Sequence, residues 1–164
     1  MKRLSNDRRF TYFCAMNKEQ IVEACFSILN QKIDQVNFAI QDANQSLHDD
    51  TKSSAGDKYE TSREMIQQDL NRYEQQLKVL NQDTEILNRI KTQKVESNKA
   101  GLGSVIQTDK AIYFLATSIG LVSVGDQKIF SISTASPIGK VLVGKAVGES
   151  FEFNGAKQVI KDLY

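Results

Sequence analysis

Proline is almost absent from this chain of 164 residues, where Pro137 is the only one. The long stretch before it therefore holds no residue that lacks a backbone N–H, which is the strongest interruption of an α-helix. Tryptophan is also absent, and His48 is the single histidine. One histidine and two cysteines cannot supply the four ligands of a structural zinc site. They also give no support to a Ser-His or Cys-His catalytic pair.

Cysteine is scarce, since only Cys14 and Cys25 occur. Two cysteines are no disulfide framework, so we expect a protein of the reducing cytoplasm, with Cys25 as a small buried apolar group. No apolar run approaches the roughly 18 residues of a membrane span, and we expect no membrane partner. The net charge is +1, which gives no general attraction to nucleic acid.

Two apolar stripes are present within residues 18–97, each with alternating steps of three and four residues. Their mean period of about 3.5 is that of a left-handed coiled coil. Most residues off the stripes are Gln, Asn, Glu, Lys or Asp, so each predicted helix has one narrow apolar seam. We predict an antiparallel coiled-coil hairpin over residues 16–97, with two helices of an ordinary bundle as the alternative. The stripes are Val22, Cys25, Leu29, Ile33, Val36, Ile40, Ala43 and Leu47, then Ile66, Leu70, Tyr73, Leu77, Leu80, Thr84 and Leu87.

A polar segment at about residues 48–60 separates the stripes and forms the predicted tip. Its Ser, Thr, Asp and Gly residues favour turns and helix caps, and Ser54 is a candidate N-cap for the second helix. The segment carries four carboxylates, Asp49, Asp50, Asp57 and Glu60. Taken alone, they indicate a solvated turn, with Asp57 and Glu60 well placed for the helix dipole.

The first 15 residues differ in character from the rest of the chain. Their apolar part is too short for a signal peptide. We hypothesise that residues 1–15 are a disordered or artefactual extension from a misplaced start codon, and that Met16 is the natural start. Asn17 would then be the N-cap of the first helix, with Glu19 in its first turn.

The composition of residues 101–164 is typical of a small β domain. Candidate strands cover 104–108, 110–117, 120–124, 128–133, 150–154 and 157–162. Asn154-Gly155 is a strong signal for a two-residue hairpin turn, and Gly125-Asp126 marks another turn. Ser136 as N-cap, Pro137 at the first position and Gly144 just past the end predict one short helix. We predict an α+β protein, in which a strongly bent antiparallel sheet wraps on this helix.

Residues 139–146, GKVLVGKA, come within one residue of a Walker A phosphate loop. That loop needs a hydroxyl after its Lys to hold Mg²⁺, and Ala146 has none. It also needs a strand before it, whereas Ser136-Pro137 starts a helix inside the motif. These departures argue strongly against nucleotide binding.

A coiled-coil hairpin followed by a small sheet domain resembles the Gre transcript-cleavage factors of bacterial RNA polymerase. The best local match is residues 133–149, STASPIGKVLVGKAVGE, which look like the S-P-[IL]-[GA]-x-x-L-[IV]-G-K-x-x-G-[DE] segment of that family. The resemblance implies an FKBP-like C-terminal domain that docks at the rim of the polymerase secondary channel. Ser136, Pro137, Lys140 and Lys145 are the residues it suggests for docking.

The same resemblance implies that the hairpin enters the channel and contacts nascent RNA only indirectly. Tip carboxylates, with Asp57 and Asp50 as the leading metal ligands and Asp49 and Glu60 as further candidates, would help the polymerase hold a Mg²⁺ that activates water for cleavage of backtracked RNA. The protein would bind no cofactor alone and would be no enzyme in itself. Because its seam is satisfied within one chain, we expect a monomer.

The tip departs from the family pattern D-x-x-E-N-A-E-Y. Aligned on Tyr59, the two key acidic positions fall on Lys52 and Ala55. Asp49, Asp50 or Asp57 would have to replace them. Two alternatives therefore stand beside the cleavage factor: a Gre-like channel binder that inhibits or modulates without cleaving, and a coiled-coil adaptor unrelated to transcription.

Overall fold

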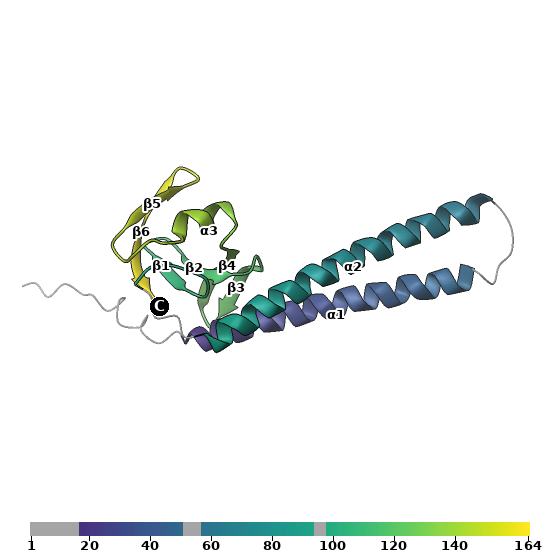
Figure 1. The fold of residues 1–164 in the computed structure, drawn as a ribbon, viewed down its shortest axis with the longest axis horizontal. Coiled ribbons are helices and arrows are strands. Elements are labelled where there is room, and N and C mark those ends of the chain that lie inside the picture. Colours follow the sequence, from purple (N-terminus) through teal and green to yellow (C-terminus); the bar gives the residue numbers. More distant parts are fainter. Residues whose placement is uncertain (1–16, 51–56, 94–97) are drawn as a thin grey trace, which may run out of the picture.

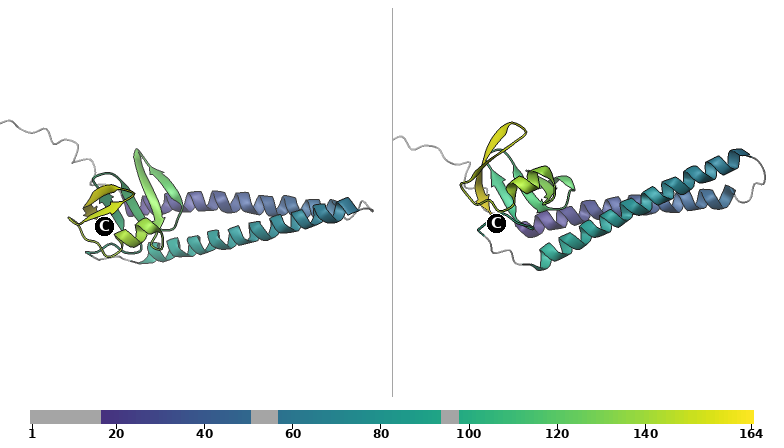
Figure 2. Two further views of the ribbon diagram at one scale, coloured as in Figure 1. Left: turned by 90° about the horizontal axis from the view of Figure 1, so that it is seen from above. Right: turned by 45° about the horizontal axis from the view of Figure 1, so that its top comes forward.

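Two long helices form a rod, and a small β domain sits at one end of it (Figure 1). The computed structural model describes residues 17–50, 57–93 and 98–164, and at residues 49–50 and 57–59 it describes the helix but not the side chains. Helix α1 covers Lys18–Asp50 and α2 covers Asp57–Thr92. They run antiparallel and pack on each other, as the further views in Figure 2 also show. The hypothesis about residues 1–15 and the predicted Ser54 cap fall outside the described residues.

The helices form where the sequence predicts them. Asn17 caps α1, because its side-chain oxygen accepts the Glu19 N–H at 3.0 Å. Every residue of the two predicted stripes is buried or half-buried, whereas most residues between them are exposed. A helix with one narrow apolar face is stable only when that face is covered, and here each helix covers the other.

The β domain contains six strands: β1 Val105–Thr108, β2 Ile112–Ala116, β3 Gly120–Val124, β4 Gln127–Ser133, β5 Ser150–Phe153 and β6 Ala156–Leu163. Their order in the sheet is β3-β4-β2-β1-β6-β5. The predicted Asn154-Gly155 turn joins β5 and β6, and both residues have positive φ, 51° and 74°. All six strands that the sequence predicts are present, with most ends shifted by one or two residues.

The prediction of a purely antiparallel sheet is wrong, because β2 and β4 pair in parallel, with Ile112 opposite Ile129 and Phe114 opposite Ser131. The remaining pairs are antiparallel, so the sheet is mixed. The physical reason is that β3 and β4 form a tight hairpin that turns back beside β2 in the plane of the sheet. Strand β4 therefore lies beside β2 and points the same way, while β3 is left at the edge. Local turn signals fix the hairpin but not which of its strands meets β2.

Strand β2 is buried on both faces, and all five of its residues are buried. On one face Ile112, Phe114 and Ala116 join the base of the hairpin in a single core. On the other face Tyr113 and Leu115 join a second core. The first core also contains Ile21, Val22, Cys25, Leu29, Leu87, Ile90, Val105, Val122 and Ile129, and the second also contains Ala100, Ile106, Leu142, Phe151 and Ile160.

Helix α3, Pro137–Leu142, lies on the face of the sheet that the hairpin does not cover. The predicted elements of this helix are confirmed: Ser136 is its N-cap, Pro137 is at its start, and Gly144 follows its end with a φ of 83°. The order of layers is thus hairpin base, sheet, α3. None of the described helices combines the length and apolar character needed to cross a lipid bilayer.

The first prediction concerns the core shared by hairpin and sheet. Leu87 has no exposed surface and lies in this core, whereas Phe38 on the rod is 72% exposed. We expect Leu87→Ala to lower the free energy of unfolding by about 2–5 kcal/mol, because it leaves a cavity between α2 and the sheet. Phe38→Ala, the control, should change it by less than about 0.5 kcal/mol. Urea unfolding measures both, and a similar small effect at Leu87 would contradict the shared core.

The second prediction concerns pH. Burial raises the pKa of the Cys25 thiol to about 11, while the neighbouring Ser131 side chain acts in the opposite direction. An unfolded thiol ionises near a pH of about 8.5, so the unfolded chain releases its proton first and stability falls as pH rises from there toward about 11.

The test compares Cys25 with Cys25→Ala by urea unfolding at neutral pH and near pH 10, both in a Cys14→Ser background. The protein with Cys25 should lose more stability on the pH increase. Equal losses would show that Cys25 does not contribute.

Candidate functional site

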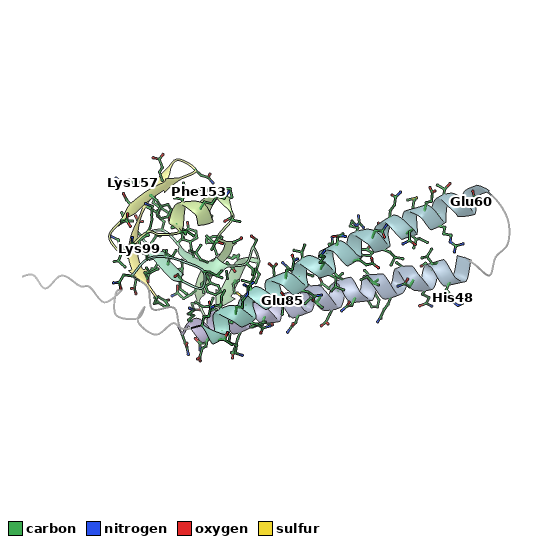
Figure 3. All side chains as sticks on the ribbon, in the orientation of Figure 1. His48, Glu60, Glu85, Lys99, Phe153 and Lys157 are labelled. Atoms are coloured by element: carbon green, nitrogen blue, oxygen red, sulfur yellow. The ribbon has the colours of Figure 1, made fainter. Side chains whose placement is uncertain are left out.

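The end of the rod away from the β domain is the first candidate site. Figure 3 places His48 and Glu60 at this end and Glu85 near the β domain. Asp49 and Asp50 end α1, Asp57 begins α2, and Glu60 lies in the first turn of α2. The structure therefore brings the backbones of all four predicted tip acids to one end of the molecule. Of their side chains, it describes only that of Glu60, which is exposed.

The helix dipole has opposite effects on these acids at the two helix ends. Asp57 and Glu60 lie at the positive N-terminal end of α2, where a carboxylate is favourable by about 0.3–1 kcal/mol. Asp49 and Asp50 lie at the negative C-terminal end of α1, where the same charge is unfavourable. The dipole explanation that the sequence suggested therefore covers two of the four acids. The dipole of α1 does not stabilise a negative charge on Asp49 or Asp50.

The described residues contain no group of three or more His, Cys, Asp or Glu side chains that would hold a metal ion. Glu60 by itself offers at most two oxygens, far short of the roughly six that Mg²⁺ prefers. A divalent ion bound at Glu60 would thus need most of its ligands from elsewhere.

The segment around α3 is the second candidate site, and it holds the four predicted docking residues. The Ser136 hydroxyl donates to the Ser133 carbonyl oxygen at 2.6 Å and accepts the Gly139 N–H at 3.1 Å. It is therefore engaged in capping α3. Pro137 and Lys140 are exposed, whereas Lys145 is half-buried, with its Nζ 3.8 Å from Glu149 Oε1. Lys140 is the more solvent-exposed of the two lysines.

The loop after α3 is tied to the segment that follows α2. The Ala100 N–H donates to the Lys145 carbonyl, and the Gly144 N–H donates to the Ala100 carbonyl, each at 2.7 Å. Ala100 is buried. We name this pair of hydrogen bonds the Ala100 bridge. It could not be predicted from the sequence, because a single alanine in a polar linker carries no local signal.

Gly139 is the residue of this segment whose importance sequence reasoning missed. A Cβ added there would collide with the Ser133 carbonyl oxygen and lie 2.9 Å from Ser136 Oγ. The first glycine of the near-Walker motif is therefore inside α3, where it allows close backbone approach, and the motif does not form a phosphate loop. This agrees with the argument against nucleotide binding.

A hollow of about 610 Å³ lies at the end of the sheet, lined among others by Lys110, Lys128 and Lys161. Asp109 at its rim accepts the Val159 N–H at 2.8 Å, which lowers the pKa of the Asp109 carboxyl. Among the described residues, neither this hollow nor the two sites above contains a nucleophile bonded to a general base.

The third prediction tests Gly139. Because its nearest neighbours are backbone atoms that move only at a cost, we expect Gly139→Ala to destabilise the protein by about 1–3 kcal/mol. Gly101→Ala is the matched control, since a Cβ there meets nothing within 4 Å. That control should be neutral or stabilising by up to about 1 kcal/mol. Urea unfolding of both variants decides the matter, and equal effects would contradict the close contact.

The candidate residues thus lie in two parts of the molecule. The exposed Glu60 is at the tip of the rod, and the capped helix α3 is on the outer face of the sheet. A scan against models of known protein families finds no match to this chain, and no curated protein matches it either.

Proposed function

We propose that this protein is an RNA polymerase-binding transcription elongation factor that inserts its hairpin tip into the secondary channel and stimulates cleavage of backtracked RNA. The observation that carries the proposal is the fold-back of one chain into a rod whose far end stands clear of the β domain (Figure 1). The 33 residues of α1 correspond to roughly 50 Å at 1.5 Å per residue. Such a rod suits a task in which a few residues must reach a site that a compact domain cannot enter.

The second support is the β domain. A sheet with one short helix on its outer face is compatible with the FKBP-like fold that the resemblance implies. In this proposal the domain docks at the channel rim through the surface around α3, where Lys140 is an exposed cation. Ser136 contributes by holding α3 in place, because its hydroxyl is already engaged. Lys145 is partly neutralised by Glu149.

The tip would act in trans. A Mg²⁺ ion, when held mainly by the polymerase, supplies an activated water for phosphodiester hydrolysis. Asp57 and Asp50, with Asp49 and Glu60, are the residues of this chain that would complete its ligand set. They would add negative charge and oxygen ligands beside the polymerase carboxylates, and the chain would have no catalytic activity alone.

A specific observation favours a second candidate, a channel binder that does not cleave. The positions that match the acids of the family motif are Lys52 and Ala55, neither of which can ligate Mg²⁺ as a carboxylate does. This candidate uses the same rod and the same docking surface. The third possibility, an adaptor in which helices of separate chains pair in parallel, is disfavoured by the fold-back of α1 on α2.

The fourth prediction separates these candidates with stalled, backtracked polymerase complexes. The protein should shorten the transcript in a Mg²⁺-dependent reaction. Replacement of Asp49, Asp50, Asp57 and Glu60 together by Ala should reduce that rate by about 10²-fold or more, because metal ligands and transition-state charge stabilisation are lost together. Glu85→Ala is the matched control, because Glu85 is an exposed carboxylate on the same helix as Glu60, at the opposite end of the rod.

Binding to polymerase is measured in parallel for each variant. Retained binding with lost cleavage supports the proposed role of the tip. Binding without cleavage by the unaltered protein supports the second candidate. If the unaltered protein fails to bind the polymerase complex at all, both candidates are wrong.

A further inference from the structure

The hollow at the end of the sheet brings together three lysines from three separate elements. Lys110 lies in the turn between β1 and β2, Lys128 lies near the start of β4, and Lys161 lies in β6. All three are exposed, and none of them forms an ion pair among the side chains that the structure describes. Three positive charges around one hollow repel each other, so their convergence favours a negative charge between them.

A register shift in the sheet positions Lys161. Gln107 of β1 lies opposite Asp162 of β6, whereas the next residue, Thr108, lies opposite Ile160. Lys161 is therefore an extra residue with no partner on β1, as in a β-bulge. Bulges re-aim a side chain and are frequent next to active sites. Here the side chain that the shift affects is one that lines the hollow.

The backbone of Lys110 is held by its turn. The buried Thr108 hydroxyl accepts the N–H groups of Lys110 at 3.1 Å and of Ala111 at 2.9 Å. The neighbouring Asp109 is held as well, because its N–H donates to the Val159 carbonyl at 3.1 Å. Since these bonds already order the turn, an anion that binds beside Lys110 loses little free energy to ordering it.

Two acids, Asp109 and Asp126, also line the hollow. Asp109 is already engaged, since one of its oxygens accepts the Val159 N–H at 2.8 Å. This bond lowers the pKa of the Asp109 carboxyl, and the positive charges of Lys110 and Lys161 lower it further. With three cations and two acids, the lining has a net charge of +1. A ligand must therefore carry several negative charges to gain from all three lysines.

Two further charges of β6 lie outside the lining, one of each sign. Asp162 follows Lys161 in the chain, and its Oδ1 accepts the Leu163 N–H at 2.9 Å. Lys157 is exposed near the start of β6 (Figure 3). They cancel each other and leave the sign of the hollow unchanged.

The size and chemistry of the hollow suit a small molecule. Its volume of about 610 Å³ is within the roughly 300–1,000 Å³ of small-molecule sites, and Ala111 and Ile112 add apolar surface beside the lysines. Lysine ammonium groups bind phosphate as point charges. The near-Walker segment, residues 139–146, does not contribute to this lining.

We propose that the hollow is a binding site for a small anion with two or more phosphate groups, held by Lys110, Lys128 and Lys161. Such an oligophosphate brings several negative charges to the lysines within one molecule and so outweighs the two acids. An organic part of the ligand would cover Ala111 and Ile112. This site is separate from the tip and from α3, and its occupation does not depend on polymerase binding.

Isothermal titration calorimetry of the full chain with inorganic pyrophosphate, ATP and citrate, without added Mg²⁺, tests the proposal. At least one phosphate probe should bind, and more weakly as the salt concentration rises. Citrate, a small carboxylate anion of comparable charge, should bind at least about tenfold more weakly than the better phosphate probe. Tighter binding of ATP assigns the site to an organic oligophosphate, and tighter binding of pyrophosphate assigns it to an inorganic one.

Five substitutions make the test specific. Lys110→Gln, Lys128→Gln and Lys161→Gln should each weaken binding of the better phosphate probe by about three- to tenfold, and the three together should abolish it. Asp126→Asn should tighten binding by about twofold or more, because it removes a negative charge from the lining. Lys157→Gln, the matched control, should leave the affinity unchanged, because this exposed lysine of β6 lies outside the hollow.

Circular dichroism on every variant confirms that the fold is intact. The proposal is overturned if neither phosphate probe binds, if citrate binds as tightly as they do, or if the triple variant keeps its affinity. A loss at Lys157→Gln as large as that at Lys161→Gln also overturns it, since binding would then follow the charge of the whole domain. None of these outcomes affects the proposed role with polymerase, which the transcript assay tests separately.

Discussion

The packing of the hairpin base on one face of the sheet is the contact that gives the molecule its shape. Leu29 and Leu87 come from the two helices, Phe114 comes from the central strand, and all three are fully buried in one core. Because this core joins elements distant in the chain, it fixes the direction in which the rod leaves the β domain. The outer part of the rod, where only α1 and α2 meet, inherits its orientation from this base.

Much of this arrangement can be predicted from the sequence where a signal is local and periodic. The two stripes predict which residues of the helices are covered, because a helix that packs on only one partner must confine its apolar residues to one seam. Asn17 and Ser136 predict helix starts for a similarly local reason, as their side chains accept hydrogen bonds from backbone N–H groups two or three residues ahead. Asn154-Gly155 predicts a turn because few other pairs tolerate two positive φ angles.

The remainder depends on contacts between distant segments. The residues near Ile112 and Ile129 do not reveal that β2 and β4 run in parallel. That pairing follows from how the β3–β4 hairpin lies beside β2 in the sheet. The sequence shows that residue 139 is glycine. The reason it must be glycine, the close approach of the Ser133 carbonyl, appears only when α3 is in its folded position. At the tip the acids are evident from the sequence, and the structure adds that their backbones share one end of the rod.

The Ala100 bridge joins two segments that are distant in the chain. Its hydrogen bonds hold residue 100, which follows α2 in the sequence, against the loop after α3, and the alanine between them is buried. Because both hydrogen bonds use backbone groups, replacing the side chain of Ala100 would leave their donors and acceptors in place.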